Sequence, residues 1–459
     1  MKFAPLRRFF YQLHLWLGVV SGLILFVVCL SGTLYVFRNE ARELASPEQF
    51  YVEASDARRL SADEIVAKVE AARPGKKVAS LTLPESSTRT VAVMLQNAPK
   101  KGDKAEKSGG KDGKSEKNGE KSQKGEKAEK GDAKAPGKDD GKNAPKGGGK
   151  PRGETIYVDP YTGEIVGDGK TPVDDFFGSV MKLHRWLWLP TEIGRPIVGV
   201  ATIIYVVLSL IGLILWLPRT AAAWRRKATW KLAFNVRFRR GGWPLVFDLH
   251  NALGFYTLLP ALILALTGLC WSFGWYRDAA GTLLGEAPFK AKNEKPEAIS
   301  VPDGATRPVS LEALIAAHNE LDPGAGDVTV AIPQEPNAAT TIQKGRVGGF
   351  FALNVKNKTR WNRFDGTVVP VERYGETVEV ERFSDKPFGA KIASSIRGIH
   401  LGEITGLSSK ILAFLVCLIA TSFPATGVAL WVRKLRARNK KEETETETAD
   451  QETSNEQTA

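Results

Sequence analysis

Four long apolar stretches limit what this 459-residue chain can fold into. They cover residues 13–37, 196–217, 245–273 and 411–432, and none of them contains a lysine or an arginine. At a helical rise of about 1.5 Å per residue, each is long enough to cross the ~30 Å hydrocarbon layer of a bilayer. The sequence therefore predicts an α-helical integral membrane protein with a four-helix transmembrane bundle.

Lysine and arginine residues cluster beside three of the stretch ends and predict the orientation of the chain. They stand before the first stretch, between the second and the third, and after the fourth. Because basic loops stay on the cytoplasmic side of a membrane, we expect both termini in the cytoplasm. The two long loops, 38–180 and 276–395, would then face the periplasm, which places the protein in a bacterial inner (plasma) membrane.

The first and third stretches share a repeated pattern that begins with a histidine. Leu13-His14 opens one and Leu249-His250 opens the other, 236 residues further on. In both, a glycine follows the histidine after four residues, and a hydroxyl–glycine pair follows later: Ser31-Gly32 in the first and Thr267-Gly268 in the third. This shared frame indicates a tandem duplication.

The duplication extends to the rest of the chain. His184 and His400 precede the second and fourth stretches, which both end in Gly-x-x-Leu-Trp, starting at Gly212 and Gly427. In each long loop a serine-capped amphipathic helix is followed by strand-like segments. We therefore expect two small α+β modules, one per half.

The domain boundaries follow from this pattern. Residues 100–152 are rich in lysine and glycine and hold almost nothing apolar, so we expect a disordered insert there, and the polar tail is expected to be disordered too. The expected units are a first transmembrane helix at 1–37, a periplasmic module at 38–180, an interfacial segment with the second helix at 181–218, a cytoplasmic linker at 219–243, the third helix at 244–275, a second periplasmic module at 276–395, an interfacial segment with the fourth helix at 396–432, and a cytoplasmic tail at 433–459.

Histidine in a membrane span is costly and indicates a site. His14 and His250 lie at similar depths on equivalent helices, just inside the cytoplasmic side. His184 and His400 fall on short helices that we expect at the outer interface, 174–189 and 391–402. No four-ligand zinc or copper set is visible, whereas one haem iron needs only two imidazole nitrogens.

Other interpretations of these histidines stay open on the residues alone. Small residues follow His14 and His250 at helical spacing, and such stripes also serve close packing of membrane helices. His184 and His400 would also fit as interfacial imidazoles bound to water. His318, in a soluble helix, is expected to be an ordinary surface residue. Candidate partners for haem propionates, or equally for lipid headgroups, lie at the outer ends of the spans: Arg38, Arg185, Arg195, Arg277 and Arg397.

The histidine frames, the Gly-x-x-Leu-Trp endings and the turn Asp159-Pro160-Tyr161-Thr162-Gly163-Glu164 resemble PepSY-associated transmembrane (PepSY_TM) proteins. The resemblance covers nearly the whole chain except 100–152 and the tail. Some members resemble ferric-siderophore reductases of the inner membrane with two b-type haems among four helices. The resemblance implies PepSY-like periplasmic modules and two haem b groups, and it implies as their axial iron ligands His14, His250, His184 and His400.

The function implied is electron transfer across the membrane to a periplasmic acceptor, a ferric siderophore, in iron uptake. It would make the protein a haem-dependent reductase without a catalytic acid or base. No dinucleotide, P-loop or flavin motif is visible, and the linker 219–243 is short. The donor would therefore be a separate cytoplasmic flavoprotein or a membrane quinol, and no nucleic-acid partner is expected.

Two other functions remain open at this point. In the first, the chain is a non-enzymatic membrane anchor whose modules bind a periplasmic partner, such as a peptidase or an uptake component. In the second, the histidines carry metal ions in a permease. A permease predicts polar residues along the spans, which are mostly aliphatic here.

Overall fold

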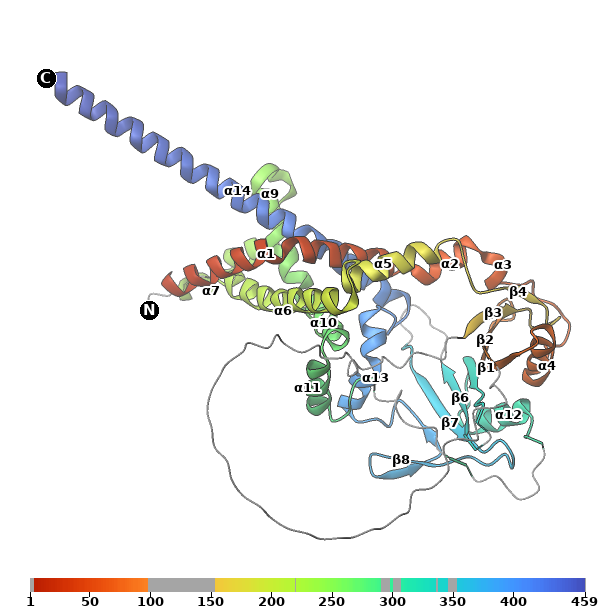
Figure 1. Ribbon diagram of the computed structural model, residues 1–459. Coiled ribbons are helices and arrows are strands. Elements are labelled where there is room, and N and C mark those ends of the chain that lie inside the picture. Colours follow the sequence, from red (N-terminus) through yellow and green to blue (C-terminus); the bar gives the residue numbers. More distant parts are fainter. Residues whose placement is uncertain are drawn as a thin grey trace, which may run out of the picture.

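A computed structural model describes residues 4–97, 153–218, 220–289, 298–299, 307–335, 337–345 and 353–458. Among these, four helices are long and apolar enough to cross a membrane, which confirms the four predicted spans. The candidate spans are Pro5–Tyr35, Thr191–Trp216, Gly242–Ser272 and Leu407–Asn439. Figure 1 shows these helices packed together, with a large sheet beyond one end of the bundle.

The bundle consists of α1 (Ala4–Tyr35), α6 (Thr191–Trp216), α10 (Gly254–Ser272) and α14 (Leu407–Thr458). Helices α1 and α10, which carry the equivalent histidine frames, each pack against both α6 and α14. The two halves of the chain are therefore interleaved in the bundle rather than set side by side.

The third span is built from three segments. Helix α9 (Gly242–Asp248) leads into η2 (Leu249–Leu253), a single turn of π-helix, and then into α10. Turns of this kind interrupt α-helices with one extra residue and often occur at functional sites. Here the π-turn contains His250, so it sets the direction of that side chain.

Shorter helices connect the bundle to the rest of the fold. They are α2 (Arg38–Ala45), α3 (Pro47–Phe50), α5 (Asp174–Trp186), α7 (Ala221–Trp224), α8 (Lys227–Phe234), η1 (Phe238–Arg240), α11 (Gly274–Leu284) and α13 (Phe388–His400). Helices α5 and α13 fall where short interfacial helices were expected. They do not merely cover the end of the bundle, because α5 packs along α1 and α13 along α10.

The strands of both long loops form one eight-stranded antiparallel sheet, in the order β10-β7-β6-β5-β1-β2-β3-β4. They are β1 (Lys76–Leu83), β2 (Val91–Asn97), β3 (Glu154–Val158), β4 (Ile165–Gly167), β5 (Asp327–Ala331), β6 (Thr340–Gly345), β7 (Lys356–Trp361) and β10 (Val380–Glu381), with β8 (Val371–Arg373) and β9 (Glu376–Val378) forming a separate hairpin. Each long loop thus contributes a helix and strands as expected, and the two modules share one sheet. Their first strands pair, Leu81 opposite Val330, which satisfies edge groups that each module alone would expose.

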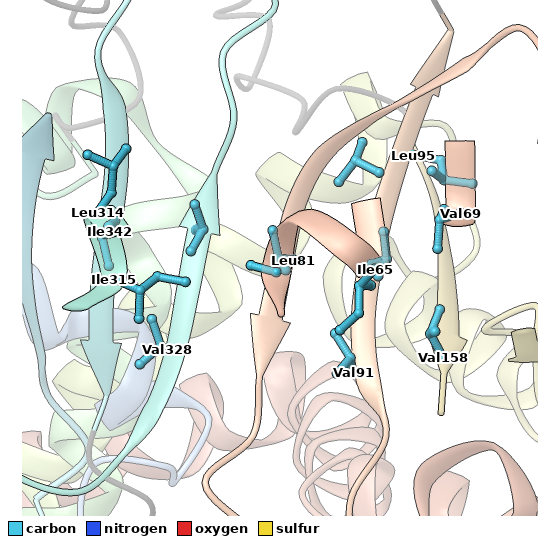
Figure 2. Packing of buried hydrophobic residues seen from close by; sticks show 14 of the residues in the cluster. Ile65, Val69, Leu81, Val91, Leu95, Val158, Leu314, Ile315, Val328 and Ile342 are labelled. Carbon is cyan, nitrogen blue, oxygen red and sulfur yellow. The ribbon is translucent and has the colours of Figure 1, made fainter. Parts of the chain in front are cut away.

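Two helices cover one face of this sheet, α4 (Ala62–Ala72) from the first half and α12 (Leu311–Leu321) from the second. Figure 2 shows their buried side chains meeting alternate residues of the strands, among them Ile65 with Val91 and Ile315 with Val328. Each helix also caps the other. The Asp63 carboxylate accepts hydrogen bonds from the backbone N–H groups of Leu311 and Glu312, and the Glu312 carboxylate accepts one from Ala62.

His318 is fully buried in α12, so the expectation of a surface residue was wrong. Its ring fills the position that Val69 occupies in α4, and its Nδ1 lies 2.9 Å from the Thr359 hydroxyl. Within the described part of the chain, its Nε2 has no hydrogen-bond partner. Burial, together with the nearby Lys344 ammonium and against the opposing effect of Asp322, lowers the pKa of His318 to about 4.

The polar tail is the second correction. Helix α14 continues beyond the membrane span to Thr458 instead of ending in a disordered tail. Segment 433–459 begins with arginines and lysines and continues with many glutamates, all of which favour helix, and extending an existing helix avoids the cost of nucleation. The lysine- and glycine-rich insert 100–152 lies outside the described residues.

Candidate functional site

His14 and His250 face each other inside the bundle. Their ring centroids are 6.5 Å apart and the ring planes are nearly perpendicular, at 87°. His14 comes from α1 and His250 from the π-turn before α10, so equivalent positions of the two halves meet at one place. We call these two residues the inner pair.

His184 and His400 form the outer pair, with ring centroids 6.2 Å apart and planes inclined by 54°. They lie in the last turns of α5 and α13. His184 reaches α1 beside Val28, seven residues before that helix ends, and His400 reaches α10 beside Leu264. The structure therefore pairs the four predicted site residues as two sets, each with one histidine from either half.

Both rings of the outer pair are oriented by backbone carbonyl groups. The Nδ1 of His184 lies 2.9 Å from the Val28 carbonyl oxygen, and the Nδ1 of His400 lies 3.0 Å from that of Leu264. Because a carbonyl oxygen only accepts, each Nδ1 carries the proton and donates it. The Nε2 of each ring is then the nitrogen with a free lone pair, as metal ligation requires.

The hydroxyl–glycine pairs of the sequence repeat surround these rings. Ser31 Oγ lies 3.2 Å from the Nδ1 of His184 in the first half of the chain, and Thr267 Oγ1 lies 3.2 Å from the Nδ1 of His400 in the second half. A third pair, Thr426-Gly427, does the same for His250, whose Nδ1 is 2.8 Å from the Thr426 hydroxyl oxygen. The sequence reasoning missed this pair, although Thr426 directly precedes a glycine that the repeat had already marked.

His14 is the exception. Ile211 stands before Gly212 at the place where the other three sites have a hydroxyl residue. Among the described residues, the buried Nδ1 of His14 has no hydrogen-bond partner of normal geometry. The inner pair therefore has one oriented ring and one that packing alone positions.

Each histidine ring lies against a glycine of the repeat. A Cβ added at these glycines would sit close to an imidazole Cε1: 3.3 Å for Gly32 and His184, 2.9 Å for Gly268 and His400, 3.4 Å for Gly212 and His14, and 3.7 Å for Gly427 and His250. The absent side chains make room for the rings, which explains why these glycines recur in both halves.

The geometry of the pairs fits an iron ion between two imidazoles. Metal–imidazole bonds are about 2 Å long and the ring centre lies roughly 1 Å beyond the nitrogen, so bis-imidazole ligation sets the centroids about 6 Å apart. The observed separations are 6.5 and 6.2 Å. Among the described residues no group of three or more His, Cys, Asp or Glu side chains gathers to hold a metal ion. Two facing imidazoles at this separation could act as two ligands of one metal ion, with the remaining ligands supplied by another group such as a macrocycle.

The two pairs occupy different depths. His14 and Val28, the residue beside His184, are fourteen residues apart on α1, which corresponds to about 21 Å along the helix axis. Helix α1 runs from the end of the bundle where the chain begins toward the side of the sheet (Figure 1), so His14, in its first half, lies farther from the sheet than Val28, which is beside His184.

The fold defines a membrane protein with four long apolar helices and a large sheet outside the bundle. The chain belongs to the family described as the PepSY-associated TM region, whose model matches residues 11–434, nearly its whole length. This confirms the resemblance seen in the sequence. Comparison with curated proteins finds no match.

Proposed function

We propose that this protein is a b-type di-haem protein of the inner membrane that passes electrons to a periplasmic acceptor, a ferric siderophore, in iron uptake. The single observation that carries the proposal is the pairing of four half-buried histidines into two facing sets at different depths. Neither an anchor nor a scaffold requires such pairs, since a buried imidazole without a ligand only adds cost.

Each histidine has a role in this proposal. His14 and His250 would hold one haem iron, and His184 and His400 a second, each through Nε2. When bound, each haem would accept and release one electron at its iron. Gly32, with its counterparts in the other three sites, leaves space for the ring that ligates.

The direction of transfer rests on the charges around the bundle. The basic segment between α6 and α9 lies at the same end as the inner pair, and the sheet lies beyond the outer pair. The positive-inside rule would place the inner pair near the cytoplasm and the sheet in the periplasm. The donor would then be a cytoplasmic flavoprotein or a membrane quinol.

The chemistry at the acceptor needs one electron and no proton transfer by the protein. An electron reduces chelated Fe(III) to Fe(II), which the hard oxygen ligands of a siderophore hold less firmly. The described chain would contribute the outer histidines and the polar surfaces next to them.

The test is spectroscopic. The purified full-length protein is expected to show a Soret band that shifts on reduction by dithionite, and pyridine haemochrome analysis should give two haems per chain. The variants His14→Ala and His250→Ala should each lose the same one haem, and His184→Ala and His400→Ala the other. Ser422→Ala, an exposed change on α14, serves as the control and should keep both.

A colourless, well-folded preparation from haem-replete cells would contradict the proposal. It would favour the anchor function instead, in which the sheet binds a periplasmic partner. In that case all four histidines should tolerate alanine while deletion of a loop abolishes function.

A further inference from the structure

Two arginines lie at the junction of α5 and α6, next to the outer pair. Arg185 follows His184 directly, and its guanidinium carbon lies 4.9 Å from the centre of the Trp186 ring. Arg195 lies in the first turns of α6. An added Cβ on its neighbour Gly194 would be 2.0 Å from the Trp186 carbonyl oxygen, so the two backbones touch there.

These positive charges lack a compensating carboxylate. Within the described part of the chain, neither Arg185 nor Arg195 has an acidic oxygen within 4.0 Å. Glu192, three residues before Arg195, also forms no ion pair with either arginine there. Burial lowers the pKa of Arg185, and the positive charge of Arg195 lowers it further. Two cations held together without an anion repel each other, and the low-dielectric surroundings make this costly.

Two donors at the junction are also unused. Among the described residues, Arg195 Nε and the Trp186 indole Nε1 are buried without a hydrogen-bond partner. Buried donors in folded proteins are nearly always satisfied, so such atoms call for an explanation. An oxyanion would satisfy the donors and compensate the charges at once.

The second half offers an internal comparison. The counterpart of Arg195, counted from the paired histidines with the one-residue offset of the repeat, is Lys410, whose ammonium forms an ion pair with the Glu40 carboxylate. Leu401 stands at the position of Arg185. The cation of the second half is thus compensated by a carboxylate of the first half, whereas Arg185 and Arg195 have no carboxylate partner among the described residues.

We propose that Arg185, Arg195 and the Trp186 indole form a binding site for an oxyanion at the outer end of the bundle. The favoured occupant is a carboxylate of the macrocycle held by the outer pair, and this choice rests on the proposed function. An anionic lipid headgroup presents the same chemistry and is independent of it.

The experiment uses the full-length protein, the double variant Arg185→Gln/Arg195→Gln and the charge-preserving Arg185→Lys/Arg195→Lys. Lys182→Gln, which removes an exposed cation from the same helix α5, is the matched control. Two readouts are taken from each: the midpoint potentials from a redox titration of haem absorbance, and the phosphatidylglycerol that copurifies, measured by native mass spectrometry against phosphatidylethanolamine.

A haem carboxylate predicts that the Gln double variant lowers the midpoint potential of one haem only, because lost positive charge favours the oxidised form. The Lys variant and the control should stay near the wild-type value. A lipid headgroup predicts instead unchanged potentials and phosphatidylglycerol binding weakened about tenfold or more, the expected loss of a charge-assisted contact.

Equal potentials and equal lipid retention in the Gln variant and the control would overturn the inference. A wild-type protein without haem would defeat the proposed function but leave the lipid readout decisive. In that case, absence of a preference for phosphatidylglycerol in the wild type would overturn the oxyanion site as well.

Discussion

The two halves of this chain share a frame but differ in how they treat equivalent buried positions. In the second half Thr426 orients His250, whereas in the first half Ile211 offers His14 no hydroxyl, and its Nδ1 has no partner of normal geometry among the described residues. In the soluble modules it is instead the second half that holds a histidine nitrogen without a hydrogen-bond partner. There the first half has an apolar Val69 and the second a buried His318 whose Nε2 has no partner among the described residues. Duplication thus preserved the positions of the rings while the groups around them diverged.

The largest expected effect concerns the two modules and pH. The folded pKa of His318 is about 4, below the ordinary 6.5, so the unfolded state binds its proton more readily. Stability contributed by the neutral ring is complete above pH 6.5 and is lost as the pH falls toward 4, by at most about 3 kcal/mol. Hydrogen exchange of the β7 amides in the full-length protein should show this loss, and the amides of β2 should not.

The variant His318→Val would make the second module resemble the first. It should remove most of the difference in acid sensitivity between β7 and β2. If β7 still loses protection selectively between pH 6.5 and 4 in this variant, carboxylates rather than His318 would be responsible.

The glycines beside the rings give the next largest effect. Gly268→Ala would place a Cβ 2.9 Å from His400, whereas Gly427→Ala would leave 3.7 Å to His250. The first requires a shift that typically costs about 1–3 kcal/mol, and the second is an ordinary contact. The midpoint temperature of thermal unfolding in detergent should therefore be clearly lower for Gly268→Ala than for Gly427→Ala. Equal midpoints would contradict this packing of the rings against the glycines.

A smaller effect is expected where the halves cap each other. Asp63 accepts two backbone hydrogen bonds from α12, whereas Glu312 accepts one longer bond, at 3.4 Å, from α4. Asp63→Ala should destabilise the sheet by about 1 kcal/mol, as loss of a helix cap does, and Glu312→Ala by less. The measurement is chemical unfolding of the full-length protein, and a larger loss in Glu312→Ala would reverse the comparison.

The smallest expected effect is a gain in stability. Ile211→Thr would restore the hydroxyl that the other three sites have and give His14 Nδ1 a partner. We expect a stabilisation of about 0.5–1.5 kcal/mol, the net value of one hydrogen bond. Thermal unfolding would measure it, and Ile211→Val, which has the shape of threonine without the hydroxyl, is the control.

Local pattern was sufficient to predict the spans and the histidine frames. Apolar length alone defines a membrane helix, and a fixed offset between repeats places His14 and His250 at equal depth. The histidine pairs themselves could be expected only as a hypothesis, since contact between α5 and α13 depends on the whole bundle. The role of Thr426 could have been predicted from the sequence, because this residue precedes a glycine of the repeat.

Other features depend on contacts that are distant in the sequence. Nothing local to Leu81 indicates that its strand pairs with Val330, because an edge strand looks the same with or without a neighbour. The burial of His318 was missed for a similar reason. Its helix is amphipathic, but which face meets the sheet at that residue depends on strands that follow it.

The seam between β1 and β5 has a consequence for how the protein is made. Roughly 240 residues, including two spans, separate these strands, so at typical elongation rates β5 follows β1 by about 12–50 s. Throughout that interval the newly made first module has an open strand edge facing solvent. Biogenesis therefore has a vulnerable period that ends only when the second half arrives, and a chain truncated between the halves should be prone to aggregation and to attack by proteases.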